Sequence, residues 1–312
     1  MTTLEAVACY LPDKRVPVED VAGQLGLTSM QVRLFRRYLG LAEIRLDPGG
    51  TLLDLLSAAA SRLAPLEDPR VRRRVRYVLY ARAMPVVVPY PVSPVRDLCR
   101  AFGLDHAAGF TVSQQACATG LLAVDLAGRL LAEDGDPDAL ALVLTGEKAF
   151  TRDARLVPGM SIFGEAAAAC LVGSDGPTDR VLSYAASVRG GFDGRLDELP
   201  EVALRFEKEY PASLAEAMSA AAGQAGMSLG ELSLILPHNV NALSWQRLCR
   251  KIGFPVSRVL LDNVPVTGHA FCADPFINYV TAVERGLLRP GDRYLVAAAG
   301  VGATFAAMVV EH

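Results

Sequence analysis

The stretch AAGFTVSQQACATGLLAVDLAGRLLA at 107–132 joins two kinds of element within one short segment. Its first residues read as a strand, and the apolar residues that follow Ala116 recur at helical spacing, which predicts a long helix. Outward from it, strand-like segments alternate with helical ones along the whole chain: LEAVACYL at 4–11, RYVLYARA at 76–83, ALALVLTG at 139–146, ELSLILPH at 231–238 and DRYLVAAAG at 292–300. This alternation predicts an α/β fold with buried sheets.

Size and charge narrow the class of protein. A chain of 312 residues with 51% hydrophobic residues can bury a large core, and its net charge of -3 gives no general attraction to nucleic acid or anionic membranes. The basic run RVRRRVRY at 70–77 is interpreted as a solvated helix end or strand flank, with contact to an acidic partner as the alternative. No apolar run reaches the ~18 residues of a membrane span and no signal-peptide pattern follows Met1, so a cytoplasmic protein is expected.

The two parts of the chain end alike. ALVLTGEKAF at 141–150 precedes FGEAAAACLVG at 163–173, and RYLVAAAGVGATFAAMVV at 293–310 likewise pairs an apolar strand, a glycine turn and a strand of small residues. This similarity predicts an internal duplication with halves 1–175 and 176–312, separated near the turn-rich GSDGPTDR at 173–180. Chance similarity within an α/β chain is the alternative.

Cys117 is the first candidate for chemistry. If the helix begins at ACATG, the unpaired amides and the positive end of its dipole stabilise a thiolate at Cys117 and offer donors to an oxyanion. The alternative is a thiol that merely packs beneath the helix. The six cysteines lack paired metal-ligand spacing, so neither zinc nor disulfides are expected.

Two histidines complete the candidate site. His238 follows the apolar strand in LILPHNVNALSWQRL at 234–248, where open α/β sheets collect their active sites. His269, in VPVTGHAFCADPFINY at 264–279, is interpreted as lying at a second strand-to-helix junction. A single histidine would more often be structural, but two together with a cysteine at a helix start favour nucleophilic catalysis.

With these motifs in order, the sequence resembles the β-ketoacyl synthase III group of the thiolase-fold condensing enzymes over nearly its whole length. ACATGLLA is similar to the nucleophile motif of the group, FGEAAAACLV to its glycine- and alanine-rich strand motif, and PHNVN to its histidine motif. GHAFCADPF stands where the group has glycine-asparagine, and GLLRPGDRYLVAAAGVGATFAAMV resembles its C-terminal strands. The resemblance implies a five-layered αβαβα fold of two fused halves, usually a homodimer, and an acyltransferase that works with acyl carrier protein or CoA thioesters and no further cofactor or metal.

Carried over by residue, the resemblance makes Cys117 the acyl acceptor and His238 its partner at the thioester. The amide of Gly302 would join that of Cys117 in an oxyanion hole. Tyr90 would reach the acyl pocket of a partner subunit, with packing on its own chain as the alternative, and Asn241 is the asparagine that trails the histidine motif.

Two departures from the group affect the expected reaction. His269 replaces the asparagine that helps to polarise malonyl thioester in the group. Because a Cys-His-His set also occurs in elongating condensing enzymes, malonyl thioester is still the favoured acceptor. The alternative is transfer to a hydroxyl or amine, with Asp274 orienting a histidine. Leu34 and Tyr38 stand where the group has its CoA-stacking tryptophan and an arginine, which predicts a preference for carrier-protein donors.

Two other functions stay open from the sequence alone. The chain could be a thioester hydrolase in which water accepts the acyl group, although a closed acyl pocket normally excludes water. It could also be a non-catalytic subunit of a synthase, against which the retained cysteine argues.

Overall fold

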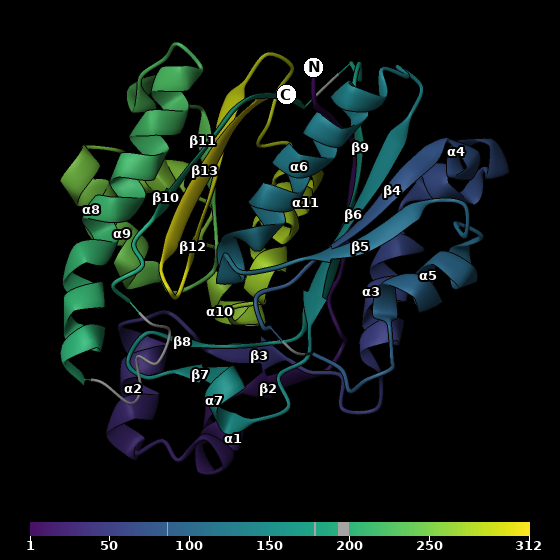
Figure 1. The fold of residues 1–312 in the computed structure, drawn as a ribbon. Helices are drawn as coiled ribbons and strands as arrows, with labels where there is room; N and C mark the ends of the chain where they lie inside the picture. Colours follow the sequence, from purple (N-terminus) through teal and green to yellow (C-terminus); the bar gives the residue numbers. More distant parts are fainter. Residues whose placement is uncertain (86, 178, 193–199) are drawn as a thin grey trace.

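The computed structural model describes residues 1–312 except 86, 178 and 193–199, which Figure 1 draws in grey. The described strands are β1 Thr3–Tyr10, β2 Arg15–Pro17, β3 Glu43–Arg45, β4 Val75–Ala81, β5 Ala108–Val112, β6 Leu140–Glu147, β7 Leu156–Val157, β8 Ser161–Ile162, β9 Ala166–Gly173, β10 Arg180–Val188, β11 Leu234–Pro237, β12 Arg293–Gly300 and β13 Thr304–Glu311. The α-helices are α1 Val18–Leu25, α2 Ser29–Arg37, α3 Leu52–Ala60, α4 Pro69–Arg74, α5 Pro94–Phe102, α6 Thr119–Asp134, α7 Arg152–Arg155, α8 Pro200–Gln224, α9 Ala242–Ile252, α10 Val264–Thr267 and α11 Asp274–Glu284.

The main sheet runs in the order β11-β12-β13-β10-β1-β9-β6-β4-β5. β4 pairs in parallel with β5 and β6, and β11 pairs in parallel with β12, whereas the other neighbours are antiparallel. β1 and β10 meet only at the pair Thr3 and Arg180. The sheet is therefore two smaller sheets joined at one point, one on each side of that junction.

Three apolar clusters fill the spaces between layers. The central cluster places α6 and α11 between the two sheets, as Figure 1 shows, with Ala127 from α6 and Ile277 from α11 buried in it. A second cluster packs α8 and α9 on the outer face of the sheet of β10–β13, and a third packs α3 and α5 on the outer face of the other sheet. The order of layers is helix, sheet, helix, sheet, helix, so the predicted five-layered fold is confirmed.

Local sequence explains where the covering helices begin and end. α5 starts after Ser93, whose side chain accepts a hydrogen bond from the Arg96 amide, and Pro94 occupies its first turn, where no amide donor is needed. The helix ends at Gly103, whose φ of 65° lies in the left-handed region that favours glycine. β9 is completely buried because it lies between β1 and β6 in the sheet and has an apolar cluster on each face, where its alanines allow close packing.

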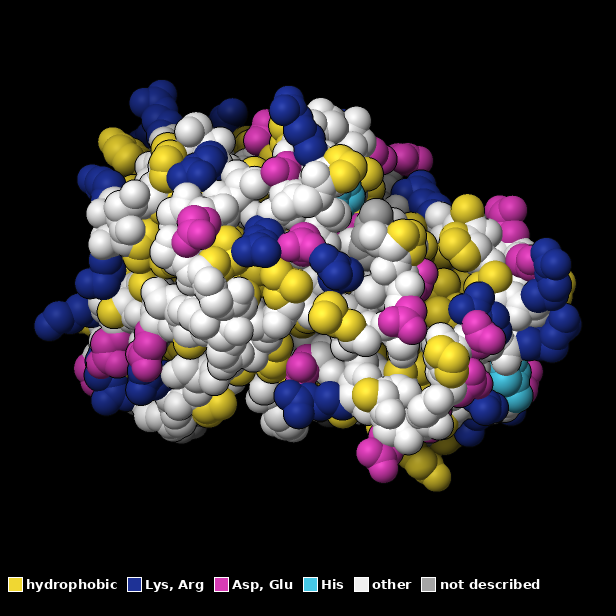
Figure 2. Space-filling model, turned by 90° about the horizontal axis from the view of Figure 1, so that it is seen from above, with side chains coloured by type: hydrophobic (Ala, Val, Ile, Leu, Met, Phe, Trp, Pro, Cys, Tyr) yellow, Lys and Arg dark blue, Asp and Glu magenta, His cyan; other side chains and the backbone are white. Residues whose placement is uncertain are grey.

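The strands predicted from alternation are confirmed to within a few residues, and the basic run at 70–77 is the end of α4 followed by β4. Figure 2 shows Lys and Arg side chains interspersed with Asp and Glu on the face that it displays. In the part of the chain that the structure describes, no helix is long and apolar enough to cross a membrane. The division into halves at 175 stays a prediction.

Candidate active site

Cys117 lies in a single 3-10 turn, Ala116–Ala118, that leads directly into α6. Ala116 has a φ of 45° and Gln114 a φ of 80°, which is the left-handed region that side chains with a Cβ avoid. The carbonyl of Ala116 accepts hydrogen bonds from Thr119 Oγ1 at 2.7 Å and from Cys272 Sγ at 3.3 Å, and these bonds hold the turn. The predicted position of Cys117 at a helix start is confirmed.

The turn between β12 and β13 closes one side of the nucleophile. A Cβ added to Gly300 would lie 2.1 Å from the carbonyl oxygen of Gln115, so only glycine allows this strand end to approach the chain before Cys117. Val301, the next residue, lines the cavity at Cys117, and Gly302 lies in the same turn at a φ of 144°. The role of the Gly302 amide in an oxyanion hole stays a prediction.

A cavity of about 210 Å³ opens at Cys117 and is called the Cys117 pocket here. Apart from Asp153 its lining is apolar, and it comprises Ala83, Met84, Pro85, Ala116, Cys117, Asp153, Ala154, Leu156, Val157, Pro158, Phe163, Phe271 and Val301. The rings of Phe163 and Phe271 stack with centroids 4.3 Å apart, and Phe163 also stacks on His269 at 4.6 Å. The pocket therefore suits an apolar acyl group next to the thiol.

His269 follows the short helix α10 and precedes α11, so its predicted place after a strand is wrong. Pro265 lies in the first turn of α10, where its ring fits a helix start, and the segment forms no sheet ladder apart from an isolated bridge between Phe163 and His269. The histidine nevertheless lies beside the Cys117 pocket, because this bridge ties it to Phe163, which lines that pocket between β8 and β9.

Asp274 binds the far side of His269. Its carboxylate is fully buried and accepts hydrogen bonds from His269 Nδ1, from the Ala270 amide at 2.7 Å and from the Asn239 amide at 2.6 Å. Since Nδ1 is bound to the carboxylate, Nε2 is the ring nitrogen left to face Cys117, which is within hydrogen-bonding reach. The structure thus brings His269 and Asp274 together beside the pocket of Cys117.

The electrostatics of this arrangement favour a charged imidazole. Burial by itself lowers the pKa of His269, but the negative charges of Asp274 and Cys117 and their hydrogen bonds outweigh it and raise the pKa to about 10. An imidazolium at neutral pH, next to a thiol, stabilises the thiolate form of that thiol. Sequence reasoning named Asp274 as an orienting residue, and its geometry agrees with that role.

His238 has a different environment although its ring centroid lies only 5.6 Å from that of His269. It follows β11 as predicted and donates its backbone amide to Ala297 at 2.9 Å. Its Nε2 is hydrogen-bonded to the hydroxyl of Tyr210 at 2.9 Å, and its buried Nδ1 has no partner among the described residues. Burial, followed by the charge of His269, lowers the pKa of His238 to about 3, so the ring is neutral.

Two other residues were predicted to belong to the site, Asn241 and Tyr90. The side chain of Asn241 caps α9 by accepting from the Ser244 amide at 2.7 Å and donates to the Met160 carbonyl at 2.9 Å, so it positions the chain after His238. Tyr90 is 98% exposed, and its reach toward a partner subunit stays a prediction.

A second cavity of about 620 Å³, called the outer groove here, lies beside the Cys117 pocket and shares Val157 and Pro158 with it. Leu34 lines it, and Tyr38 at the end of α2 is exposed. The remaining lining is Leu39, Gly159, Met160, Ala203, Leu204, Glu207, Asn241, Leu243, Ser244 and Arg247. Its two charged residues, Arg247 and Glu207, pair with each other at 3.1 Å.

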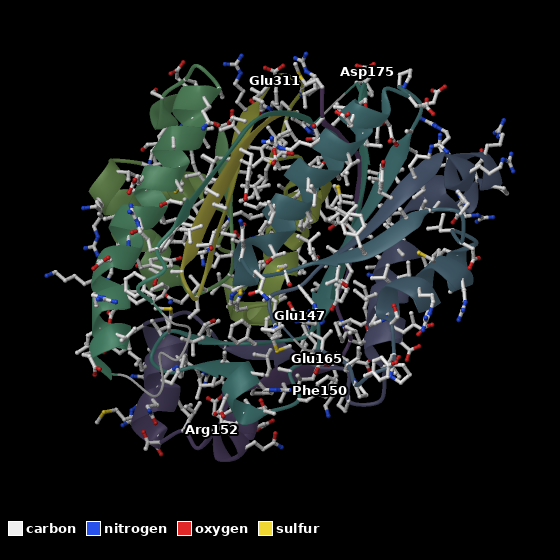
Figure 3. The ribbon with its side chains drawn as sticks, in the orientation of Figure 1. Glu147, Phe150, Arg152, Glu165, Asp175 and Glu311 are labelled. Carbon is white, nitrogen blue, oxygen red and sulfur yellow. The ribbon has the colours of Figure 1, made fainter. Side chains whose placement is uncertain are left out.

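Sequence reasoning missed Tyr210 and Glu147. Glu147 ends β6, and Figure 3 shows it at the same end of the molecule as Glu165, opposite Asp175 and Glu311. Its carboxylate accepts the amides of Ala83 and Met84, at 2.5 and 2.9 Å, and burial raises its pKa to about 7. Glu147 could have been noticed as a charged residue in the apolar run ALVLTGEKAF, whereas no sequence pattern distinguished Tyr210.

The comparisons with known proteins agree with this geometry. Residues 222–312 match the family model described as the C-terminal part of 3-oxoacyl-[acyl-carrier-protein] synthase III. A β-ketoacyl-[acyl-carrier-protein] synthase III of Lactobacillus delbrueckii subsp. bulgaricus is 25% identical over 97% of this chain and 96% of its own length.

Solved structures show the same fold. The synthase III of Aquifex aeolicus VF5 superposes with a TM-score of 0.83, at 20% identity, and covers 100% of both chains. ChlB3, described as an acyltransferase, superposes with a TM-score of 0.84, at 20% identity, over 99% of this chain and 97% of its own.

Fold and site together define a thiolase-fold acyltransferase of the condensing-enzyme type. The family-model match over residues 222–312 and the similarity to a curated relative over nearly the whole chain confirm the resemblance to β-ketoacyl-ACP synthase III that was read from the motifs.

Proposed function

We propose that this protein transfers an acyl group from a carrier thioester in two steps, and that Cys117 holds the acyl group between them. The observation that carries the proposal is the hydrogen bond between buried Asp274 and His269 next to the Cys117 pocket, in which the carboxylate keeps the imidazole charged near the thiol. A thiolate stabilised in this way is a nucleophile at neutral pH.

In the loading step the Cys117 sulfur attacks the carbonyl carbon of the donor thioester. The charge that develops on the carbonyl oxygen would be met by the amides of Cys117 and Gly302, each contributing roughly 3 kcal/mol in comparable sites. The bond to the carrier sulfur then breaks, and the leaving thiolate takes the proton from His269 Nε2. His269 is left neutral, with Nδ1 still bound to Asp274.

Malonyl thioester is the first candidate acceptor, supported by relatives that are named for β-ketoacyl products. In this reaction malonyl thioester loses carbon dioxide, and the released electron pair forms a carbon–carbon bond with the acyl carbonyl while Cys117 leaves as thiolate. The enolate needs hydrogen-bond donors at the thioester oxygen. His238 and His269 lie close enough together to share that task once a proton from solvent has returned to Nε2 of His269.

A hydroxyl or amine is the second candidate acceptor, and the bond between His269 and Asp274 specifically favours it. After loading, neutral His269 can take the acceptor proton at Nε2 while Asp274 stabilises the resulting imidazolium. The acceptor oxygen or nitrogen then bonds to the acyl carbon, and the proton returns to the Cys117 sulfur. ChlB3, the acyltransferase with a similar fold, supports this candidate by its description.

The donor and the partners follow from the surfaces around the site. We propose an acyl carrier protein as the preferred donor, because Leu34 and Tyr38 offer no aromatic clamp paired with a cation for the adenine of CoA. A homodimer is supported by β5, an edge strand with mostly exposed residues that a second copy could extend. The thiol and the imidazole supply the proposed chemistry, so no metal or organic cofactor is part of it. Location in the cytoplasm stays a prediction.

Intact-mass spectrometry after incubation with acyl-carrier thioesters tests the proposed function. The wild type should gain one acyl group, located at Cys117 after digestion, and Cys117→Ala should gain none while keeping its circular-dichroism spectrum. A stoichiometric adduct on Cys117→Ala would refute the proposal. Rapid release of free acid without an acceptor would instead identify a thioester hydrolase.

The donor preference has its own test. Loading of Cys117 by the same acyl group should be faster from carrier protein than from CoA, since loss of base stacking weakens nucleotide binding by roughly 1–3 kcal/mol, or about one to two orders of magnitude. Leu34→Trp should narrow the difference. A clear advantage of CoA in the wild type would contradict the proposed donor.

A further inference from the structure

Tyr210 lies on α8 next to residues that line the outer groove, and its side chain contacts His238. Ala203 and Glu207 of α8 line the groove, and Tyr210 follows them at helical spacing on the same stripe of the helix, one turn further along. It is only 4% exposed and packs between Phe206 and Phe305. Its hydroxyl points to His238 Nε2, which lies 2.9 Å away.

Tyr210 and His238 are both uncharged at neutral pH. Burial, followed by the charge of Cys117, raises the pKa of the Tyr210 hydroxyl, so the phenol keeps its proton. The pKa of His238 falls to about 3. A neutral imidazole has one donor and one acceptor nitrogen, and Tyr210 engages Nε2 in either tautomer.

His238 is also closed off from both cavities. His238 is 1% exposed, and neither the Cys117 pocket nor the outer groove has it among its lining residues. Its other ring nitrogen, Nδ1, is buried and has no partner in the part of the chain that the structure describes. A thioester could therefore use Nε2 of His238 only if the hydrogen bond from the Tyr210 hydroxyl were given up.

We propose that Tyr210 is a specificity-determining residue that withholds His238 from malonyl thioester and so restrains decarboxylation relative to transfer through His269 and Asp274. Decarboxylation needs a donor on each side of the thioester oxygen, and the hydroxyl keeps Nε2 of His238 engaged. Transfer to a hydroxyl or amine needs only His269 Nε2, which Tyr210 does not bind. The inference rests on the proposed transfer through Cys117.

The test compares wild type, Tyr210→Phe and Tyr210→Ala after each has been acylated at Cys117. Carbon dioxide released from labelled malonyl-carrier protein is measured against the amount of acyl-Cys117 found by mass spectrometry. Tyr210→Phe removes only the hydroxyl, and we expect several-fold more carbon dioxide per acylated protein than in the wild type. Tyr210→Ala also opens the space, and we expect a rise of about tenfold or more.

Tyr279→Phe is the matched control, because Tyr279 also gives its hydroxyl to a buried group, Asp179 at 2.6 Å, but belongs to a different hydrogen-bond network. It should release carbon dioxide at the wild-type rate. If Tyr210→Ala does not fold, Tyr210→Phe decides alone. Unchanged or reduced release in Tyr210→Phe overturns the inference, since the hydroxyl would then be idle or would itself serve the reaction. A wild type that never forms acyl-Cys117 would refute the proposed function itself.

Discussion

His238 and His269 show how single neighbours set the chemistry of two residues of the same type. Both rings are buried and lie 5.6 Å apart, yet the pKa of His238 falls to about 3 and that of His269 rises to about 10. Burial acts on both in the same direction, so the difference comes from the charges beside them, above all the carboxylate of Asp274. Asp274 thereby assigns the role of acid and base to His269.

Replacing Asp274 tests this assignment. In Asp274→Asn the imidazole loses its anionic partner, so burial should bring the pKa of His269 below neutrality and Cys117 should lose its cationic neighbour. We expect alkylation of Cys117 by iodoacetamide at pH 7 to slow by about tenfold or more and its pH profile to move to higher pH. Asp179→Asn, which alters a buried carboxylate bound by Tyr294, serves as control. Matching profiles for Asp274→Asn and wild type would contradict the assignment.

The other thiols should react more slowly than Cys117. Burial, followed by the charge of Glu284, raises the pKa of Cys9 to about 11, and burial also raises the pKa values of Cys99, Cys170, Cys249 and Cys272. Peptide mapping after brief labelling of the native protein with iodoacetamide should find Cys117 first. Equal labelling of all six cysteines would show that the site confers no special reactivity.

At the scale of elements, α6 connects the nucleophile to the segment that carries His269. A Cβ at Gly120 would lie 2.9 Å from the carbonyl oxygen of Cys272 and 3.1 Å from the ring of Phe276, so α6 must approach this segment without a side chain. The turn that carries Cys117 and the segment that carries His269 are therefore joined by one close contact at Gly120. We expect a displacement of either segment to displace the other.

Gly120→Ala and Gly23→Ala form a matched pair that tests this contact. Gly120→Ala should destabilise the protein by about 1–3 kcal/mol and slow acyl loading, because the neighbouring carbonyl belongs to the backbone and has to move. Gly23 lies in α1 with no atom within 4 Å of an added Cβ, so alanine there should be neutral or stabilise by up to about 1 kcal/mol. Urea unfolding of both variants gives the comparison, and equal effects would argue against a close contact at Gly120.

Sequence patterns predicted those elements whose apolar residues repeat regularly. The helix after Cys117 and the strand before His238 follow from such repeats. The prediction of a strand before His269 was wrong. Most residues of α10 are β-branched, as is typical of a strand, but Pro265 in the first turn and Gly268 after the last favour a short helix. Asp274 could be named from its nearness in sequence to His269, but Tyr210 depends on the rotation of α8, which a sequence pattern does not fix.

At the scale of the whole molecule, the layered fold brings together three segments that are far apart in the chain. Cys117 comes from the start of the central helix α6, His238 from the end of β11, and His269 from the turn before α11. The parallel pairs β4 with β5 and β11 with β12 end on the side of the molecule where Figure 3 shows Glu147 at the end of β6. Helices on both outer faces exclude water from these strand ends, so the two histidines are buried together with the thiol.

Burial of a neutral histidine makes the stability of the whole fold depend on pH. Because the folded-state pKa of His238 is about 3, below the ordinary 6.5, its contribution to the free energy of unfolding is complete above pH 6.5 and is lost as the pH falls toward 3.

Replacing His238 with glutamine removes the titration but keeps an amide that can bond to Tyr210. The wild type should therefore lose roughly 3 kcal/mol relative to His238→Gln between pH 7 and pH 4. Urea unfolding followed by circular dichroism at both pH values measures this difference, and the other titrating groups, including His269 and Glu147, are common to both proteins. The same pH dependence of stability in both proteins would mean that His238 is protonated or hydrated in the folded state. A charged His238 could then act as a second hydrogen-bond donor to malonyl thioester.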